Sequence, residues 1–360
     1  MLYFSKIKLF IIYLIIAILS FFSFINFIDN KENFILSKKV KLGLDLQGGS
    51  YLLLQVDTGP IVTQYLQQKL VALSKSLKKN KIKHQSLKLK DQSINFKIKE
   101  EEIENFEKFF LNKENPINIY YNQYRSYEMD YSIEGDIVEL KYSKFGMIEI
   151  NNAALDQSLE IVRRRIDEVG TNEPTIIRRG SDRILVELPG LDDPNRIKNL
   201  LGKTANLTFR LVSETEDDFG SELLSYEENE SQLSVSKRVV LSGNNLISAQ
   251  PSFDNQNNQT TVNISLDRAG AKKFARVTQN NVGKRLAIIL DNKIISAPVI
   301  QDAIVTGSGR ITGDFTFQSA TDLALLLRSG ALPAPLNIIE ERTVGPDLGE
   351  DSIKAGAFSL

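Results

Sequence analysis

The sequence predicts an α+β protein held to a membrane by one N-terminal transmembrane helix. Three observations support this class. Residues 9–28 are apolar and uncharged, strands and helices follow the order βαββαβ twice, and the composition is globular, with 42% apolar and 25% charged residues. A chain of 360 residues is long enough for two or three domains. Most of the length is therefore expected to fold as aqueous domains.

The N-terminal stretch is expected to be a retained anchor. Twenty helical residues at ~1.5 Å each reach roughly 30 Å, the thickness of the hydrocarbon core. A cleaved signal peptide is the alternative, but its apolar core is usually about 7 to 15 residues long, and no A-x-A-like site follows this stretch. Lysines lie on both sides of it, so the flanking charge does not decide the orientation.

From residue 51 onward, the pattern predicts a first βαββαβ unit. Strands are expected at 51–56, 86–90, 94–98 and 117–121, with helices at 60–77 and 101–110. A hairpin over 131–142, which turns at Glu134-Gly135-Asp136, leads into the next unit.

The second unit begins with the clearest helix of the chain. Its apolar residues recur at steps of 4, 3, 4 and 3, and Gly170 follows as a left-handed C-terminal residue; they are Leu155, Leu159, Val162, Ile166 and Val169. Two strands, 175–179 and 183–188, a helix from Asp193-Pro194 to Gly202 and a strand at 205–212 come next. Two split βαβ units in tandem are therefore expected.

The remaining sequence predicts a connection, a different α+β region and a returning strand. Residues 214–232 are rich in Glu, Ser and Asp and are expected to be solvated. The elements predicted after them are strands within 239–262, a helix capped by Asp267 and running to about 279, a hairpin of 286–290 and 294–300 around Asp291-Asn292, a helix from Thr316 to Gly330, and a strand at 336–341.

Residue usage excludes several function classes. The 44 Lys and Arg residues balance 45 Asp and Glu residues, so no global field attracts nucleic acid. Cysteine is absent, which removes disulfides, thiolate metal sites and cysteine nucleophiles. His84 is the only histidine and is expected at an exposed strand edge, so a histidine-based catalytic pair cannot form within the chain.

No sequence motif points to catalysis. Gly307-Ser308-Gly309 is not a G-x-S-x-G motif and lacks the lysine of a phosphate-binding loop. Asp45 and Asp57 share no face as an acid and base pair. The arginines at 163–165 point in three directions, and we expect a solvated face with one arginine paired. We assign no catalytic, cofactor-binding or metal-binding residue.

Several spaced motifs together resemble the SecD family, the accessory membrane subunits of the bacterial Sec protein-export machinery. The similarity covers residues 1–353 in order. The motifs are 42–49 (LGLDLQGG), 164–174 (RRIDEVGTNEP), 186–190 (VELPG), 290–298 (LDNKIISAP) and 327–335 (LRSGALPAP). Within the first motif, Asp45, Gly48 and Gly49 are the residues near the membrane.

The resemblance implies an arrangement of domains. Residues 1–28 would form the transmembrane helix with a short cytoplasmic start, and 29–240 a periplasmic base of two ferredoxin-like units. An inserted, movable head would occupy 241–312, residues 313–345 would return to complete the base, and 346–360 would start the next membrane region. Gly243 and Gly313, at the two expected crossings, are hinge candidates.

The resemblance also implies a function without enzymatic activity or a cofactor. The family assists preprotein export across the bacterial inner membrane, as a multi-pass protein that uses the proton motive force together with SecF. The expected partners are SecF, the SecYEG channel, YajC and the unfolded preprotein. Proton coupling is expected outside these residues, because the family places its ionisable group in further membrane helices.

Leu246, Ile247 and Phe253 are the candidates for preprotein contact, because exposed apolar side chains and strand edges can hold extended chain without sequence preference. The main alternative is a membrane-tethered periplasmic scaffold or binding domain that handles no substrate. A periplasmic hydrolase is a third class, which would need convergent polar groups in a deep pocket.

Overall fold

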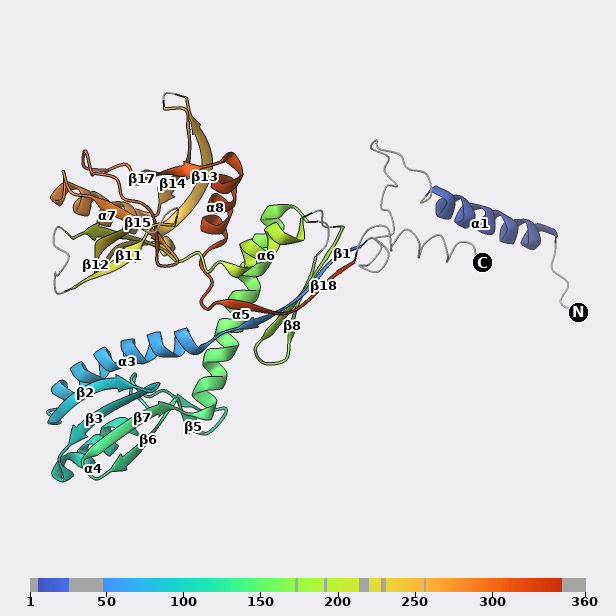
Figure 1. Ribbon diagram of the computed structural model, residues 1–360. Helices are drawn as coiled ribbons and strands as arrows, with labels where there is room; N and C mark the ends of the chain where they lie inside the picture. The colour runs from blue at the N-terminus through green and yellow to red at the C-terminus, as the bar shows by residue number, and fades with distance from the viewer. Residues whose placement is uncertain are drawn as a thin grey trace, which may run out of the picture. The chain divides into compact units, whose positions relative to one another are not determined.

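The computed structural model describes residues 6–25, 48–171, 174–190, 193–213, 220–227, 231–255 and 257–344, and it confirms a mixed α+β architecture (Figure 1). Internal contacts divide the chain into two units, Met1–Gly48 with Val344–Leu360, and Gly49–Thr343.

The first unit contains helix α1 (Lys6–Ile25). Among the described residues, no helix is both long enough and apolar enough to cross a membrane, so the expected transmembrane helix over 9–28 is not confirmed. The helix differs from the predicted stretch at both ends, because it includes Lys6 and Lys8 and ends at Ile25.

The base of the second unit is a four-stranded sheet assembled from distant parts of the chain. Its strands lie in the order β18-β1-β9-β8, and β9 pairs antiparallel with both β1 and β8. The predictions of these four strands are confirmed; they are β1 (Gly49–Val56), β8 (Thr175–Arg179), β9 (Arg183–Pro189) and β18 (Leu336–Val344).

Two helices accompany this sheet, and side chains define where they begin. Helix α5 (Lys144–Val169) starts at Ser143, whose side chain accepts a hydrogen bond from the Gly146 N–H, and ends at Gly170 with φ +81°. Helix α6 (Pro194–Gly202) starts at Asp193, which accepts from the Arg196 N–H. Helix α5 contacts β1, β8 and β9.

The first long insertion, residues 57–143, is called the lobe here. It holds a sheet of order β2-β3-β7-β6 and a separate two-stranded hairpin. Its elements are α3 (Gly59–Lys79), β2 (His84–Lys90), β3 (Ser93–Ile98), α4 (Ile103–Phe110), β4 (Tyr120–Tyr121), β5 (Ser126–Tyr127), β6 (Met129–Glu134) and β7 (Ile137–Tyr142).

The strand pairing in the lobe contradicts the prediction of a first βαββαβ unit. The strand expected at 117–121 does not join the four-stranded sheet, because only β4 forms there and it pairs with β5. Asn118 is buried and satisfies the backbone in another way: its amide donates to the carbonyls of Phe110 and Met129, and its side-chain oxygen accepts from the Met129 N–H at 2.8 Å. The tandem arrangement of two such units is therefore wrong.

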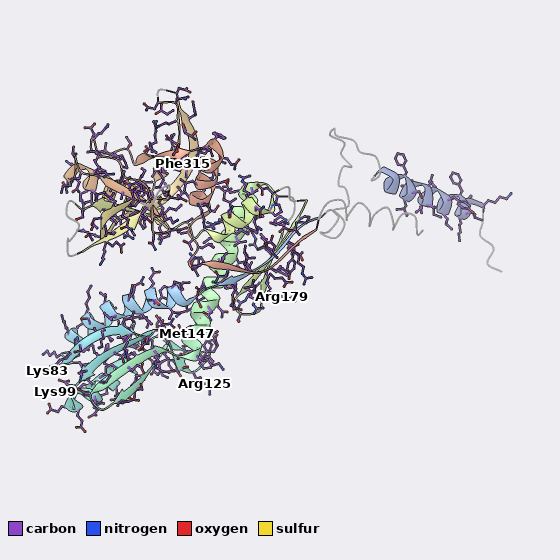
Figure 2. All side chains as sticks on the ribbon, viewed as in Figure 1. Lys83, Lys99, Arg125, Met147, Arg179 and Phe315 are labelled. Carbon is purple, nitrogen blue, oxygen red and sulfur yellow. The ribbon has the colours of Figure 1, made fainter. Side chains whose placement is uncertain are left out.

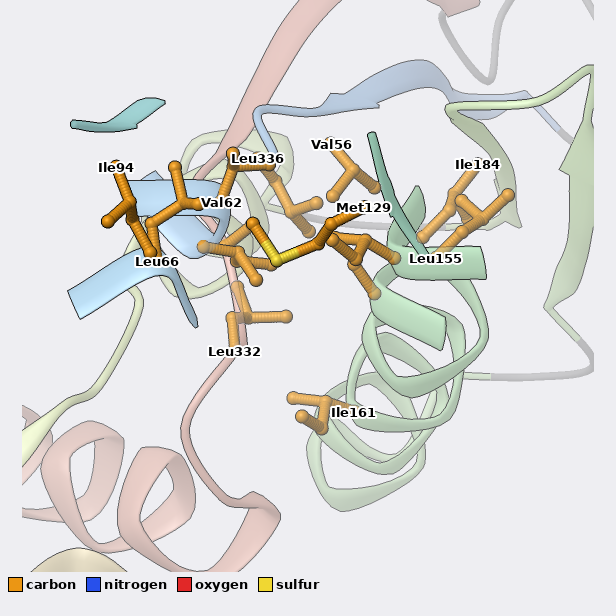
Figure 3. Close-up of a cluster of buried hydrophobic side chains, with 14 of the residues drawn as sticks. Val56, Val62, Leu66, Ile94, Met129, Leu155, Ile161, Ile184, Leu332 and Leu336 are labelled. Atoms are coloured by element: carbon orange, nitrogen blue, oxygen red, sulfur yellow. The ribbon is translucent and has the colours of Figure 1, made fainter. Parts of the chain in front are cut away.

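One hydrophobic core joins the lobe to the base (Figure 3). Buried side chains from lobe elements pack in the same cluster as side chains from the base sheet and α5. The residues drawn from the lobe include Val62, Leu66, Ile94 and Met129, and those from the base include Leu155, Ile184 and Leu336. The two regions therefore exclude water together.

The second long insertion, residues 204–332, is called the head. It has a five-stranded sheet, β11-β12-β10-β15-β16, a three-stranded sheet, β13-β14-β17, and helices α7 and α8. The elements are β10 (Leu207–Val212), β11 (Ser221–Ser225), β12 (Gln232–Ser242), β13 (Leu246–Asp254), β14 (Gln259–Leu266), α7 (Arg268–Asn280), β15 (Leu286–Leu290), β16 (Lys293–Ser296), β17 (Ser308–Phe315) and α8 (Phe317–Ser329).

The head differs from the predicted boundaries. Strand β10 pairs with β12 and β15, so the strand expected to close the second unit belongs to the head. Strand β11 lies within 214–232, where a solvated connection was expected, and the expected boundary at 241 falls inside β12. The cap at Asp267, the helix start at Thr316 and the turn at Asp291-Asn292, with φ +49° and +65°, are confirmed.

Candidate functional site

Strand β13 presents two of the three predicted contact residues to solvent. It lies at one end of its sheet, paired with β14. The side chain of Ile247 is 69% exposed and that of Phe253 is 51% exposed, whereas Leu246 is partly buried and packs against the head core. Two large apolar side chains near the ends of one edge strand are therefore available to a partner.

The backbone edge of β13 is partly closed. Arg328 of α8 donates from Nη1 to the Ala249 carbonyl at 2.7 Å, and Pro251 has no N–H to offer. Proline and a covering side chain are common ways to protect an edge strand from uncontrolled pairing. The middle of β13 thus offers less for continuous strand addition than its two exposed side chains do.

The two hinge candidates lie within elements of the head. Gly243 opens a 3-10 turn between β12 and β13, and a Cβ there would lie 3.3 Å from the Leu207 side chain. Gly313 lies inside β17, where a Cβ would lie 3.0 Å from the ring of Phe315, a residue labelled in Figure 2. Close packing explains a small residue at both positions.

The chain passes between base and head at two other places, after α6 and after α8, and Arg165 holds both. This side chain of α5 is 1% exposed. Its Nη1 donates to the carbonyls of Leu200 at 2.7 Å and Lys203 at 2.5 Å, and its Nη2 donates to those of Thr204 at 3.3 Å and Gly330 at 3.2 Å. One guanidinium therefore ties the outgoing segment to the returning one.

Arg165 keeps its positive charge although it is buried. Burial lowers the pKa of its guanidinium to about 10, while the charge of Asp291 acts in the opposite direction. Three of its acceptor carbonyls lie at the C-terminal end of α6, where the helix dipole is negative. At neutral pH the side chain is therefore cationic and bound to carbonyl oxygens.

The prediction of a solvated face with one arginine paired is wrong for Arg165. Arg163 and Arg164 are exposed and bond to Glu160, whereas Arg165 is buried without a carboxylate partner in the described structure. A signal was present in the sequence, because residue 165 lies three positions after Val162 and four before Val169, on the apolar face of the helix.

Asp291 fixes the outgoing segment from the head side. Its carboxylate, in the turn between β15 and β16, accepts from the N–H groups of Ala205 at 3.0 Å and Asn206 at 2.8 Å, and from the Thr204 hydroxyl. The Thr204 carbonyl in turn accepts from the Leu332 N–H at 2.8 Å. These bonds make the two crossing segments one hydrogen-bonded joint.

Two ion pairs connect α8 to the helices of the base. Arg328 donates to Glu168 of α5 at 2.7 Å, and Arg196 of α6 donates to Asp322 at 2.8 Å. The side chains of both pairs are partly exposed. Such pairs each contribute about 0.2–1 kcal/mol and weaken with salt.

The other predicted residues have local roles. His84 lies at the start of β2, an end strand of its sheet, and Asp57 accepts a hydrogen bond from the Gly59 N–H at 3.1 Å. Gly48 and Gly49 lead into β1 with φ +72° and +136°, and Asp45 lies outside the described residues. Within the described ranges, no group of three or more His, Cys, Asp or Glu residues is placed to hold a metal ion.

Comparison with family models gives three matches along the chain. The model described as "SecDF, P1 head subdomain" matches residues 221–334, which lie almost entirely in the head. The model "Protein translocase subunit SecDF, P1 domain, N-terminal" matches 155–214, and the "SecD/SecF GG Motif" matches 34–60.

Curated relatives extend the match to most of the chain. It is 42% identical over 335 residues to the protein translocase subunit SecD of Rickettsia prowazekii and 41% identical over 330 residues to that of Acetobacter pasteurianus, each time over 90% of this chain. The chain spans 62% and 63% of these relatives. A crystal structure of SecDF in a super-membrane-facing form aligns with a TM-score of 0.52 and 26% identity, over 99% of this chain and 38% of that one.

Proposed function

This chain belongs to the SecD family of protein translocase subunits, and we propose that its head engages unfolded preprotein during export across the bacterial inner membrane. The observation that carries the proposal is the exposure of Ile247 and Phe253 on an edge strand. In this proposal the protein acts as an auxiliary subunit of the Sec translocase and makes no covalent change in the polypeptide.

Engagement through β13 is apolar and weakly selective. Exposed Ile and Phe side chains gain free energy from any apolar segment that covers them, at about 25 cal/mol per Å² of area buried. Because the Ala249 carbonyl is already bonded and Pro251 has no N–H, side-chain contact contributes more than a continuous backbone ladder. Weak contact of this kind suits a polypeptide that must move on.

The proposed setting follows the family. The chain is placed in the inner membrane with Gly49–Thr343 in the periplasm, and it works with SecF, the SecYEG channel and YajC while the proton motive force supplies the energy. The exposed apolar side chains of α1, which include Phe10 and Leu19, support attachment of this helix to lipid.

The proposed base is a ferredoxin-like sheet with two insertions. The order β1, α5, β8, β9, α6, β18 is βαββαβ, and the spatial order β18-β1-β9-β8 supports this assignment. Motion of the head is proposed about the crossings after Gly202 and after Ser329. Gly243 and Gly313 stay candidates for smaller movements within the head.

Photocrosslinking from position 247 tests the proposal. A photoreactive residue replaces Ile247 in membranes that contain SecF and the channel, during export of a stalled preprotein. The matched control replaces Val71 of α3, whose side chain is 55% exposed in the lobe. We expect adducts between position 247 and the moving chain, and few from position 71. Adducts from position 247 to membrane subunits alone contradict substrate handling and favour the scaffold.

A further inference from the structure

The head contains a basic hollow that the proposed function does not use. It lies between α7 and β12 and has a volume of about 340 Å³. Arg238 of β12 and Lys273 and Arg276 of α7 line it, together with Asn280 at the end of α7. Among the residues that line it there is no carboxylate. The hollow is therefore positively charged at neutral pH.

The sequence around the hollow concentrates positive charge. Residues 268–290 contain six Lys and Arg residues and no Asp or Glu, and residues 231–253 also have no acidic residue. The whole chain, in contrast, carries a net charge of only −1. The local field at α7 and β12 therefore differs from the average field of the protein.

The geometry of α7 turns the charges toward one side. Lys273, Arg276 and Asn280 follow one another at steps of 3 and 4, which places them on one face of the helix. Phe274 and Thr278 are buried on the opposite face against the head core and the loop before β17. The helix cannot rotate its basic face away without exposing Phe274.

These three cations differ from several arginines of the head. Arg210, Arg310 and Arg328 each form an ion pair with a carboxylate. Within the part of the chain that the structure describes, neither Arg238, Lys273 nor Arg276 has such a partner, and all three are exposed. They are available to a ligand, and an anion bound between them would reduce their mutual repulsion.

We propose that this hollow binds a phosphate-class oxyanion. Three separate cations and the Asn280 amide offer more donors than the two oxygens of one carboxylate can accept, whereas a phosphate group has three or four acceptor oxygens. Arginine forks match phosphate oxygens in pairs, and the lysine adds a point charge. The same chemistry is presented by free phosphate and by the headgroup of an anionic phospholipid.

The apolar residues that line the hollow give a way to distinguish these two sources. Val239 and Val277 line it beside the cations, so the part of a lipid next to its phosphate meets apolar surface that free phosphate leaves uncovered. A lipid headgroup with short acyl chains should then bind more tightly than inorganic phosphate. Equal affinities identify free phosphate as the ligand.

Calorimetric titration of the full chain in a non-ionic detergent, at constant ionic strength, tests the proposal. The probes are inorganic phosphate and a short-chain phosphatidic acid kept below its micelle concentration. The variants are Lys273→Gln with Arg276→Gln, and separately Arg238→Gln on the other element. The control, Lys78→Gln with Lys79→Gln, removes the same charge from the exposed end of α3.

Saturable binding that weakens at least tenfold in both hollow variants and stays within twofold in the control is the expected result. Three results overturn the proposal: no saturable binding of either probe, equal weakening in the control, and tighter binding of an acidic peptide such as hexaglutamate than of either phosphate probe. Unchanged melting of the variants by circular dichroism establishes that the loss is local.

Discussion

The lobe and the head are both long insertions into one sheet, yet they are joined to it in different ways. The lobe shares a continuous hydrophobic core with the base, in which Leu66 and Leu155 are both fully buried (Figure 3). The head has its own core, to which the base contributes Leu200 of α6 and the partly buried Val169 of α5, and its crossings are held by Arg165, by Asp291 and by two ion pairs. A shared core makes two regions unfold together, whereas a polar joint allows them to separate.

The difference matters for a subunit that handles moving polypeptide. Separating the lobe from the base would expose a large apolar area to water, at a free-energy cost of about 25 cal/mol per Å². Opening the polar joint exposes the contacts of Leu200 and Val169 with the head core. It also exchanges hydrogen bonds between protein groups for hydrogen bonds to water, which costs about 0.5–1.5 kcal/mol for each bond. We therefore expect the head to be the region that changes its position.

Truncation of a side chain in the shared core is expected to have the largest effect on stability. Leu155→Ala removes a fully buried side chain and is expected to cost about 3–5 kcal/mol of unfolding free energy, for the lobe and base together. Urea unfolding followed by hydrogen exchange mass spectrometry measures the loss by region. The matched variant Leu326→Ala in the head core should destabilise the head and leave the lobe protected. Loss in the base alone would mean that the core is not shared.

Removal of the buried guanidinium has the next largest effect. Arg165→Met keeps an apolar stem but leaves the carbonyls of Leu200, Lys203, Thr204 and Gly330 without this donor, and is expected to cost about 2–3 kcal/mol. The loss of exchange protection should be confined to the two crossing segments. Arg164→Met, on the exposed side of the same helix, should change stability by less than about 0.5 kcal/mol. Similar losses in both variants would contradict a joint role for Arg165.

The ion pairs at the joint should contribute less. A double-mutant cycle with Glu168→Gln and Arg328→Gln is expected to give a coupling energy of about 0.5–1 kcal/mol that decreases between low and high salt. Because Arg328 also donates to the Ala249 carbonyl, the single variant at 328 should cost more than the one at 168. A coupling near zero would mean that this ion pair adds nothing to the other contacts of the joint.

Alkaline pH should lower the unfolding free energy of the lobe, and this is the smallest of the expected effects. Burial, with the charge of Glu128 in second place, raises the pKa of Tyr121 to about 12 and also raises the pKa of Tyr142. Since the folded state holds these protons more tightly than the unfolded state, their contribution is complete below pH 10, and the part that Tyr121 contributes is lost as the pH rises through about 12.

Urea unfolding at pH 9, 10, 11 and 12 checks this direction. The transition of the lobe and base should move to lower urea concentration more than that of the head does. Tyr142→Phe removes one phenol whose oxygen has no hydrogen-bond partner in the described structure, and should remove part of the shift. Equal shifts for both transitions in both proteins would contradict the assignment.

Local signals in the sequence predict the local structure well. The cap at Asp267, the helix starts at Asp193 and Thr316, the left-handed Gly170 and the turn at Asp291-Asn292 depend on neighbours within a few residues, and each is confirmed. Ile247 and Phe253 are exposed, whereas Leu246, predicted with them, is partly buried, and contact with preprotein stays a prediction.

Strand partners were harder to predict, because pairing depends on distant segments. Strand β1 pairs with β9, more than a hundred residues away, and adjoins β18 in the same sheet. Strand β10 has the same apolar character whether it closes the base or enters the head, so its sequence does not distinguish the two. The buried role of Arg165 was missed for a related reason, since its acceptors come from α6 and from the end of α8.

Native-state hydrogen exchange of the full chain, over a series of low urea concentrations, tests the difference between the two junctions most directly. Amides of β3 and β7 in the lobe and of β1 and β9 in the base should lose protection together, at one free energy of opening. Those of β10, β14 and β15 in the head should follow a separate curve, and the crossing segments should exchange before either. A single curve for all three regions would contradict the polar joint and would mean that head, lobe and base unfold as one body.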